Sequence, residues 1–194
     1  MAVETHIYDD TFFENTRKFE EESARSFVKI ILENFTLESV VDIGCGVGIY
    51  LKEFQAAGKE VLGYDGAPAA IKNSLVGKNI QLHDLSTPLQ LDKKFDLCMC
   101  VEVAEHLPPE SADTIIETLI GLSDTVIFTA AIPGQGSREI GHINEQPHEY
   151  WIEKFEKNGF TYQKELSEKI CEQLKASGVI WWIVQNCMIF KKTS

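Results

Sequence analysis

The spacing of apolar residues along the chain switches repeatedly between a strand pattern and a helix pattern. Short apolar runs rich in β-branched and aromatic residues predict strands, whereas apolar residues repeated every three or four positions predict amphipathic helices. The predicted strands in the first two thirds of the chain are 40–43, 61–65, 80–82, 95–101 and 125–130. The predicted helices there are 15–34, 50–57, 68–75 and 110–122. This alternation is typical of an α/β fold with a doubly wound parallel sheet.

The two ends of the chain add further elements to this pattern. Ahead of the first helix, Tyr8, Phe12 and Phe13 form an aromatic cluster that either packs on the core or closes over a ligand. Beyond residue 130 the predicted elements are a helix over 147–157, a strand over 160–162, a helix over 165–176 and a strand over 180–190. If the last run is extended, Trp181 and Trp182 point to opposite faces, one in the core and one at the surface or at a substrate mouth.

The segment from Val40 to Gly48 reads Val-Val-Asp-Ile-Gly-Cys-Gly-Val-Gly and combines a buried strand, a tight loop and a helix start. Glycine is needed where the backbone takes a positive φ or where a ligand approaches the main chain closely. Three glycines at alternate positions therefore predict a loop that receives a ligand. Asp42 precedes them, and its carboxylate is placed either to accept hydrogen bonds from a cationic amine or to hold the loop.

Two further acids follow predicted strands in the same half of the chain. Asp65 ends the second strand, where a βαβ unit places an acid beside the hydroxyls of a bound ribose. Asp84 and Leu85 follow the third strand. Each acid alone also fits a helix cap at the end of a strand. A dinucleotide fingerprint needs a third glycine where this chain has Ile49, which argues against a nicotinamide enzyme.

The pattern Asp-x-Gly-x-Gly-x-Gly, with the two acids that follow it, resembles the class I S-adenosylmethionine-dependent methyltransferases over residues from about Val40 through Phe160. The resemblance implies a Rossmann-like, seven-stranded sheet whose last strand is antiparallel. It also implies that the glycine loop lies under the methionine part of S-adenosylmethionine, while the later acids hold the ribose and the adenine amino group. Carried over by position, the cofactor-binding residues are Asp42, Gly44, Gly46, Asp65, Asp84, Leu85 and Glu102.

Two glutamates and a histidine follow the fourth predicted strand, in the sequence Glu102-Val-Ala-Glu105-His106. Open α/β sheets bind their ligands at this edge. Methyl transfer from a sulfonium is an in-line displacement, so an enzyme must hold the nucleophile on the axis of the S–CH₃ bond. A hydroxyl nucleophile must also lose its proton to a base such as histidine, or be acidified by a bound cation. The candidate catalytic residues are Glu105, His106 and, beyond the fifth strand, His142.

The spacing Glu-x-x-Glu-His resembles the metal-binding segment of the ubiquinone-pathway O-methyltransferases and the small-RNA 2′-O-methyltransferases. In both groups two glutamates, the adjacent histidine and a later histidine surround a divalent cation. The resemblance implies a metal set of Glu102, Glu105, His106 and His142, with His148 as second choice for the last position. Such a set suits Mg²⁺, Mn²⁺ or Fe²⁺. Many methyltransferases carry this spacing without a metal, and His142 or His106 is then the candidate general base.

Composition and charge narrow the class of partner. At 194 residues and 44% hydrophobic, the chain fits one globular domain, which we divide into an N-terminal helical cover (1–36), a cofactor-binding half (37–130) and an acceptor-side half (131–194). The net charge of −12 disfavours nucleic acid as a partner. No apolar run reaches about 18 residues, so no membrane span is expected. Five cysteines without a C-x-x-C pair, and no signal-peptide pattern, predict a cytoplasmic protein with reduced thiols.

The acceptor is predicted from the loop Gly-His-Ile-Asn-Glu-Gln-Pro-His-Glu-Tyr-Trp at 141–151, which resembles a segment of small methyltransferases that accompany glycan biosynthesis genes. Asn144, Glu145 and Gln146 suit the hydroxyls of a sugar. We therefore predict an S-adenosylmethionine-dependent O-methyltransferase acting on a sugar, a glycan or another small polar acceptor, with Mg or Mn as a further cofactor if a metal binds. Two alternatives stay open: an aromatic or quinone-type O-methyltransferase, and a non-catalytic subunit that binds S-adenosylmethionine. Nothing in the sequence indicates an oligomeric state.

Overall fold

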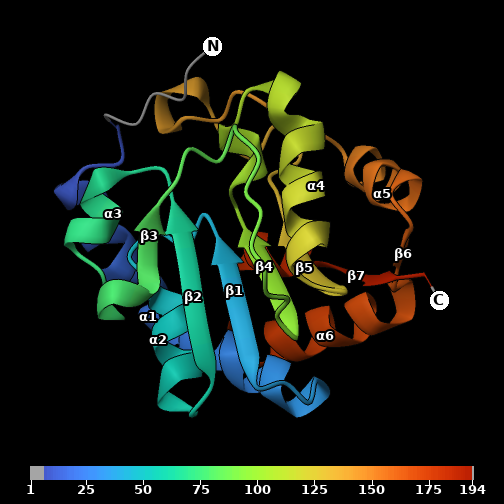
Figure 1. Ribbon diagram of the computed structural model, residues 1–194, viewed down its shortest axis with the longest axis horizontal. Coiled ribbons are helices and arrows are strands. Elements are labelled where there is room, and N and C mark those ends of the chain that lie inside the picture. Colours follow the sequence, from blue (N-terminus) through green and yellow to red (C-terminus); the bar gives the residue numbers. More distant parts are fainter. Residues whose placement is uncertain (1–6, 194) are drawn as a thin grey trace.

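The computed structural model describes residues 7–193 as a seven-stranded sheet with helices on both faces (Figure 1). The strands lie in the order β3-β2-β1-β4-β5-β7-β6. Their bounds are β1 Ser39–Ile43, β2 Glu60–Asp65, β3 Ile80–Leu82, β4 Leu97–Val101, β5 Thr125–Thr129, β6 Phe160–Tyr162 and β7 Met188–Lys192. The first five strands pair in parallel, whereas β7 is antiparallel to both β5 and β6. The predicted doubly wound sheet with an antiparallel last strand is confirmed. The first six residues of the predicted helical cover lie outside the described residues.

Helices connect the strands throughout the described chain. The α-helices are α1 Asp10–Asn34, α2 Ile49–Ala56, α3 Pro68–Lys72, α4 Ala112–Leu122, α5 His148–Lys157, α6 Lys164–Ala176 and α7 Trp181–Asn186. Short 3₁₀ helices are η2 Gly77–Asn79, η3 Ala104–His106, η4 Pro109–Ser111 and η5 Arg138–Ile140. None of the helices in residues 7–193 has both the length and the apolar character needed to cross a membrane.

The sheet separates two apolar layers. On one face, α1, α2, α3, α6 and α7 pack against strand residues that include Val40 and Met99. On the other face, α4 and α5 pack against strand residues that include Val41 and Cys98. Neighbouring residues of one strand enter different layers because successive side chains point to opposite faces of a sheet. Each fully buried aliphatic side chain contributes about 1.5–3 kcal/mol to the stability of the fold. Because both faces of the strands are buried, apolar residues are favoured at every strand position, which explains the continuous apolar runs in the sequence.

Helix α1 begins five residues before the predicted start, at Asp10. The side chain of Asp9 caps it, because its Oδ1 accepts a hydrogen bond of 2.8 Å from the backbone N–H of Phe12. Phe12 and Phe13 therefore belong to the first turn of the helix rather than to a segment ahead of it. The buried side chains of Phe27 and Ile31 pack the same helix against the core. As a result, the N-terminal end of α1 projects over the edge where the parallel strands end.

The prediction of a strand from residue 180 onwards is wrong over its first half. Residues Trp181–Asn186 form helix α7, and the strand starts only at Met188. A short apolar run without a clear period fits a strand or a buried helix equally well, so tertiary partners decide its structure. Here Trp182 stacks on Phe19 of α1, with ring centroids 6.2 Å apart. The two adjacent tryptophans consequently do not lie on opposite faces of the sheet.

Other boundaries differ from the predictions by a few residues. Helix α3 ends at Lys72, three residues before the predicted end. Helix α5 begins at His148, and Pro147 is the residue just before it rather than its first helical residue. Because His142 precedes Pro147, it lies in the loop before α5, as expected.

Candidate active site

A cavity of about 810 Å³ opens at the edge of the sheet where the parallel strands end. Its lining includes Asp65 at the end of β2, Val101 at the end of β4, and the glycine loop that follows β1. Side chains from α1 and α7 form further walls. Open α/β sheets bind their ligands at this position, and the volume is typical of a small-molecule site.

Two glycines of the loop line this cavity with backbone conformations that strongly favour glycine. Gly44 has a φ of 80° and Gly46 a φ of 52°, both in the left-handed region. A Cβ at Gly44 would lie 2.3 Å from a methyl carbon of Val103. A Cβ at Gly46 would lie 3.2 Å from the ring of Phe13. Glycine at both positions therefore allows the end of β4 and the start of α1 to approach the loop.

Asp42 and Asp65 lie beside this loop in different hydrogen-bonding environments. Asp42 is only 2% exposed, and its Oδ1 has no hydrogen-bond partner among the described residues. Burial, with the charge of Asp65 as a second cause, raises the pKa of Asp42 to about 8. Asp65 accepts hydrogen bonds of 2.8 Å from the backbone N–H groups of Gly46 and Ala67, although burial raises its pKa. An unpaired buried carboxylate is costly, so Asp42 is suited to a cationic group of a ligand.

The acid after the third strand lies at the outer rim of the cavity. Asp84 is exposed, and its Oδ1 accepts hydrogen bonds from the hydroxyl and the N–H of Ser86 at 2.7 and 3.0 Å, which lower its pKa. Leu85 beside it is buried. The structure thus gathers around one cavity all the residues predicted to bind the cofactor: Asp42, Gly44, Gly46, Asp65, Asp84, Leu85 and Glu102.

Glu102 has a backbone conformation that is rare outside glycine. Its φ is 54°, and no other non-glycine residue in the described part of the chain has a positive φ. Its N–H donates to the carbonyl and the hydroxyl oxygen of Thr129, at 3.1 and 2.9 Å. Its Oε1 accepts a hydrogen bond of 3.2 Å from Asn186, the last residue of α7. Backbone strain of this kind costs about 1–3 kcal/mol and is concentrated at functional sites.

Glu105 is fully buried at the cavity wall. Its Oε1 accepts a hydrogen bond of 3.2 Å from the N–H of Ala131, while its Oε2 has no partner among the described residues. Burial, followed by the charge of Glu102, raises the pKa of this carboxyl well above its ordinary range. The backbone carbonyl of Glu105 accepts hydrogen bonds of 2.9 Å from Ile143 and Asn144. These bonds bring the loop that carries His142 to the end of β4.

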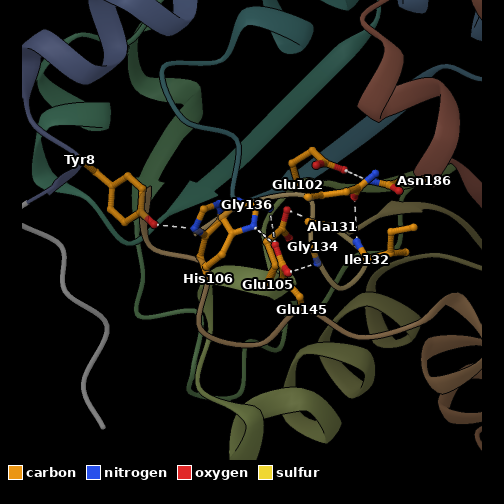
Figure 2. Close-up of polar contacts among 12 residues, drawn as sticks. Tyr8, Glu102, Glu105, His106, Ala131, Ile132, Gly134, Gly136, Glu145 and Asn186 are labelled. Atoms are coloured by element: carbon orange, nitrogen blue, oxygen red, sulfur yellow. Dashed lines mark hydrogen bonds and ion pairs between the residues drawn. The ribbon is translucent and has the colours of Figure 1, made fainter. Parts of the chain in front are cut away.

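Two histidines, His106 and His142, meet beside this glutamate, and Figure 2 shows His106 between Tyr8 and Glu105. The rings of His106 and His142 are nearly perpendicular, with centroids 4.7 Å apart. The hydroxyl of Tyr8 lies 2.9 Å from Nδ1 of His106. Burial, with His142 as a second cause, lowers the pKa of His106 to about 4. His106 is therefore neutral at pH 7, the form that binds a metal or accepts a proton.

Glu145 holds the second histidine in place (Figure 2). Its Oε1 lies 2.8 Å from Nδ1 of His142. The same carboxylate accepts hydrogen bonds from the backbone N–H groups of Gly134 and Gly136, at 2.7 and 2.6 Å. Burial acts to raise the pKa of Glu145, but the hydrogen bonds from Gly134, His142 and Gly136 outweigh it and lower the pKa. An ionised Glu145 thus orients the ring of His142 through its contact with Nδ1.

Three of the four residues predicted to bind a metal come together. The ligand atoms of Glu105, His106 and His142 all lie within 4.8 Å of one another. Glu102 is not part of this group, and its carboxylate is held by α7 instead. His148 opens α5 and is not among the residues that line the cavity. One oxygen and two nitrogen ligands suit Mn²⁺, Fe²⁺ or Zn²⁺ better than Mg²⁺, which prefers oxygen.

The loop residues that we assigned to sugar hydroxyls are engaged within the protein. Asn144 is 3% exposed and donates from Nδ2 to the carbonyl of Ala104 at 3.2 Å. Gln146 donates to Oδ1 of Asn144 at 3.0 Å, and Glu145 holds His142. None of the three lines the cavity. This part of the support for a sugar acceptor is therefore lost.

Sequence reasoning missed several cavity residues because no short motif marks them. Glu20 lines the cavity, yet in the sequence it is the first of three consecutive glutamates on a polar helix face. Tyr50 and Gln135 also line the cavity, and they lie far from Glu20 in the sequence. Only the tertiary packing of α1, α2 and the segment after β5 brings these side chains to one cavity.

The fold, the glycine loop and the acids around the cavity define a class I S-adenosylmethionine-dependent methyltransferase. The chain belongs to the family described as "Methyltransferase domain", which matches residues 16–120. The predicted methyltransferase class is thereby confirmed, and the nicotinamide alternative is excluded.

Curated relatives connect the chain to ubiquinone-pathway enzymes, as predicted. The ubiquinone biosynthesis O-methyltransferase of Chromobacterium violaceum is 30% identical over 107 residues, which are 47% of this chain and 44% of the relative. The mitochondrial enzyme of the same name from Schizosaccharomyces pombe is 32% identical over 82 residues, which are 38% of this chain and 30% of the relative. Each match thus spans less than half of the relative's length.

Solved structures share the fold over most of the chain. An S-adenosylmethionine-dependent methyltransferase from Archaeoglobus fulgidus has a TM-score of 0.64 and 20% identity, covering 93% of this chain and 99% of its own. Magnesium protoporphyrin IX methyltransferase from Synechocystis, with bound S-adenosylhomocysteine, has a TM-score of 0.60 and 24% identity, covering 77% of both chains. At these identities the likeness concerns the fold.

Proposed function

We propose that this chain transfers the methyl group of S-adenosylmethionine to a hydroxyl oxygen of a small acceptor. The observation that carries the proposal is that one cavity joins the acids beside the glycine loop to the cluster of Glu105, His106 and His142. S-adenosylmethionine supplies an electrophilic methyl group on a positively charged sulfur. The chain's own residues then have to bind that cofactor, orient the hydroxyl and remove its proton.

Cofactor binding falls to the acids at the ends of the strands. Asp42 offers an unpaired carboxylate oxygen to the amino group of the methionine part. Asp65 faces the same cavity and is assigned to the ribose hydroxyls, and Asp84 at the rim to the adenine amino group. Leu85 adds a buried apolar side chain beside the adenine.

Proton removal falls to the histidine cluster. His142 is oriented by Glu145 and is our candidate for the base that takes the hydroxyl proton. Glu105, His106 and His142 also fit a divalent cation, because their ligand atoms converge and Oε2 of Glu105 is an unpaired buried acceptor. A cation held there acidifies a bound hydroxyl, with Mn²⁺ preferred over Mg²⁺ on the donor set. Both routes use the same three side chains.

Among acceptors, the cavity mouth favours an aromatic ring over a sugar. Exposed apolar side chains gather there: Phe12 is 38%, Ile140 53% and Trp181 58% exposed. The curated relatives are O-methyltransferases of ubiquinone biosynthesis, which points the same way. We therefore place a phenolic or quinone-type acceptor first. The sugar or glycan acceptor predicted from the sequence becomes the second candidate.

Calorimetric titration with S-adenosylmethionine, followed by a methyl-transfer screen, tests the proposed function. The screen offers phenols, catechols, sugars and RNA ends, each with Mn²⁺, with Mg²⁺ and with a chelator. We expect cofactor binding and transfer to a phenolic hydroxyl. Absence of cofactor binding would overturn the proposal, and binding without transfer to any acceptor would favour the non-catalytic subunit.

Variants of the histidine cluster separate chemistry from cofactor binding. Glu105→Ala and His142→Ala are expected to abolish turnover while S-adenosylmethionine still binds, because both side chains lie beyond the cofactor acids. Glu149→Ala, which changes an exposed residue of α5, is the matched control. Turnover that survives both changes, with or without chelator, would remove the base and the metal from the mechanism.

A further inference from the structure

The described lining of the cavity contains several carboxylates and two histidines. Among the described lining residues there is no lysine or arginine, whereas the acids are Glu20, Asp42, Asp65, Asp84, Glu102 and Glu105. The proposed function uses all of these except Glu20, which comes from α1, and Glu102, which α7 holds. Burial raises the pKa of several of these carboxyls, among them Glu20, Asp42 and Glu105. A cationic group in the cavity would favour their ionised form, whereas an anionic group would find no basic side chain among the described lining residues.

Glu20 lies in this cavity without a hydrogen bond or ion pair to any described residue. Burial, with the charge of Glu102 as a second cause, raises its pKa to about 7. A half-buried carboxylate in such a place is costly unless a positive group pairs with it. Glu20 therefore has the properties of a residue whose partner is a ligand.

Tyr50 provides an independent sign of a ligand at the same place. Its ring is 7% exposed and lines the cavity, but its hydroxyl has no hydrogen-bond partner among residues 7–193. Glu20 and Tyr50 line the same cavity, and burial, followed by the charge of Glu20, raises the pKa of the Tyr50 hydroxyl. Buried hydroxyls are normally hydrogen-bonded, so an unpaired one facing a cavity indicates a missing polar partner.

Tryptophan rings close the other side of this region. Trp182 is half-buried, lines the cavity and stacks on Phe19 of α1 with an interplanar angle of 5°. The ring of Trp181 is nearly perpendicular to that of Trp182, with centroids 5.6 Å apart. The face of a tryptophan ring attracts an ammonium group within about 6 Å of its centre.

We propose that Glu20, Tyr50 and Trp182 form a subsite for an ammonium group on the methyl acceptor. The acceptor is then a small molecule that carries both a hydroxyl and an amine. This inference rests on the proposed function, and it narrows the acceptor class beyond a neutral phenol or sugar. It also explains the absence of basic residues from the described cavity lining, because an anionic acceptor would need one.

Two other cations are less suited to this subsite. The ammonium group of S-adenosylmethionine is served by Asp42, which lines the cavity beside the glycine loop and whose Oδ1 has no partner among the described residues. A metal ion needs several ligand atoms close together, and Glu20 belongs to no such cluster within the described residues. An organic ammonium group needs only one carboxylate, one hydroxyl acceptor and an aromatic face.

Three phenols of matched shape test the subsite: tyramine, 4-ethylphenol and 3-(4-hydroxyphenyl)propanoate. Their side chains carry a positive charge, no charge and a negative charge at pH 7. Binding to the full chain saturated with S-adenosylhomocysteine is measured by calorimetry. We expect tyramine to bind at least about tenfold more tightly than 4-ethylphenol, and the propanoate to bind most weakly.

Variants identify the residues responsible. Glu20→Gln should remove the preference for tyramine over 4-ethylphenol while S-adenosylhomocysteine binds as in the wild type. Glu22→Gln, an exposed glutamate of the same helix, should change neither affinity. Trp182→Leu should reduce the preference through loss of the ring face, which keeps the test valid if Glu20→Gln does not fold.

The outcomes separate this inference from the proposed function. Equal affinity for the three phenols, in a protein that binds S-adenosylhomocysteine, would overturn the ammonium subsite alone. Loss of S-adenosylhomocysteine binding in Glu20→Gln would assign Glu20 to the cofactor and overturn the subsite as well. A wild-type chain that binds no S-adenosylhomocysteine would overturn the proposed function itself.

Discussion

Individual buried acids in this chain lower the stability of the ligand-free protein, and we expect the same acids to bind the ligand. Asp42 shows this most clearly, since burial raises its pKa from the ordinary value of 3.8 to about 8. A carboxyl whose pKa is higher in the folded than in the unfolded state stabilises the fold below pH 4. That contribution is lost as the pH rises through 8. Stability near neutral pH is therefore lower than it would be with a neutral side chain at this position.

Replacement of Asp42 by asparagine tests this relation. Without ligand, Asp42→Asn should be more stable than the wild type at pH 8, by an amount on the order of a few kcal/mol, and about equally stable at pH 4. Urea unfolding at pH 4, 6 and 8 measures the difference. The same variant should lose affinity for S-adenosylmethionine. Asp92→Asn, at an exposed position, is the control, and an unchanged pH dependence in Asp42→Asn would contradict the expectation.

The pairing of Glu145 with His142 makes a second prediction for a single side chain. Glu145→Gln keeps the shape but removes the charge that orients His142. Turnover should fall by roughly 10–100-fold, as for other carboxylates that orient a functional histidine, with unchanged affinity for S-adenosylhomocysteine. Glu145→Asp should recover part of the activity because it restores the charge. Steady-state kinetics together with calorimetry check both values, and equal turnover in Glu145→Gln and wild type would refute the positioning role.

At the scale of elements, the site depends on how closely the glycine loop approaches the end of β4. Gly44 and Gly58 form a matched pair for this question, because their φ angles are 80° and 79°. A Cβ at Gly44 would meet Val103 at 2.3 Å, whereas a Cβ at Gly58 would have nothing within 4 Å. Replacement of either glycine by alanine therefore has the same cost of placing a side chain at a positive φ, but only the replacement at Gly44 adds a steric clash.

Alanine at these two positions should have different effects. Gly58→Ala should lower the free energy of unfolding by about 1–2 kcal/mol, the cost of a left-handed residue, and leave cofactor binding intact. Gly44→Ala should cost about 1–3 kcal/mol more from overpacking and should also abolish cofactor binding. Chemical denaturation and calorimetry measure the two effects. Normal cofactor affinity in Gly44→Ala would show that the loop tolerates a displaced Val103.

Helices α1 and α7 form the part of the cavity that we propose receives the acceptor. Both contribute cavity walls, and the stacked rings of Phe19 and Trp182 join them. Helix α7 also holds the strained Glu102 through Asn186, whose Nδ2 lies 2.9 Å from Oε1 of Gln135 as well. This part of the cavity is thus assembled from segments far apart in the chain.

At the scale of the whole molecule, ligand binding should appear as a gain in stability. A ligand that binds only the folded state at a hundred times its dissociation constant stabilises it by about 2.7 kcal/mol. For a chain of this length, that gain corresponds to a rise in Tm of roughly 5–10 °C. S-adenosylhomocysteine should produce this rise in differential scanning fluorimetry and NAD should not. A shift with NAD in place of S-adenosylhomocysteine would contradict the assignment of the class.

Local patterns in the sequence predicted the architecture and several residues that line the cavity. The apolar runs predicted the strands that form the sheet, because burial on both faces demands continuous apolar residues. The glycines at 44 and 46, and the acids Asp65 and Asp84, were predictable since each follows a strand whose end fixes its position at the sheet edge. The trio of Glu105, His106 and His142 was also predicted, from a resemblance in spacing, and the structure brings it together.

Only the tertiary structure decided the rest, because it depends on contacts between distant segments. Tyr8 reaches His106 across 98 positions of sequence, and the carboxylate of Glu102 accepts a hydrogen bond from Asn186, 84 positions later. The run at 180–190 has no period that separates a helix from a strand, so packing on α1 made its first half helical. Glu20 carries no sequence signal at all, and its role follows from the cavity into which α1 places it.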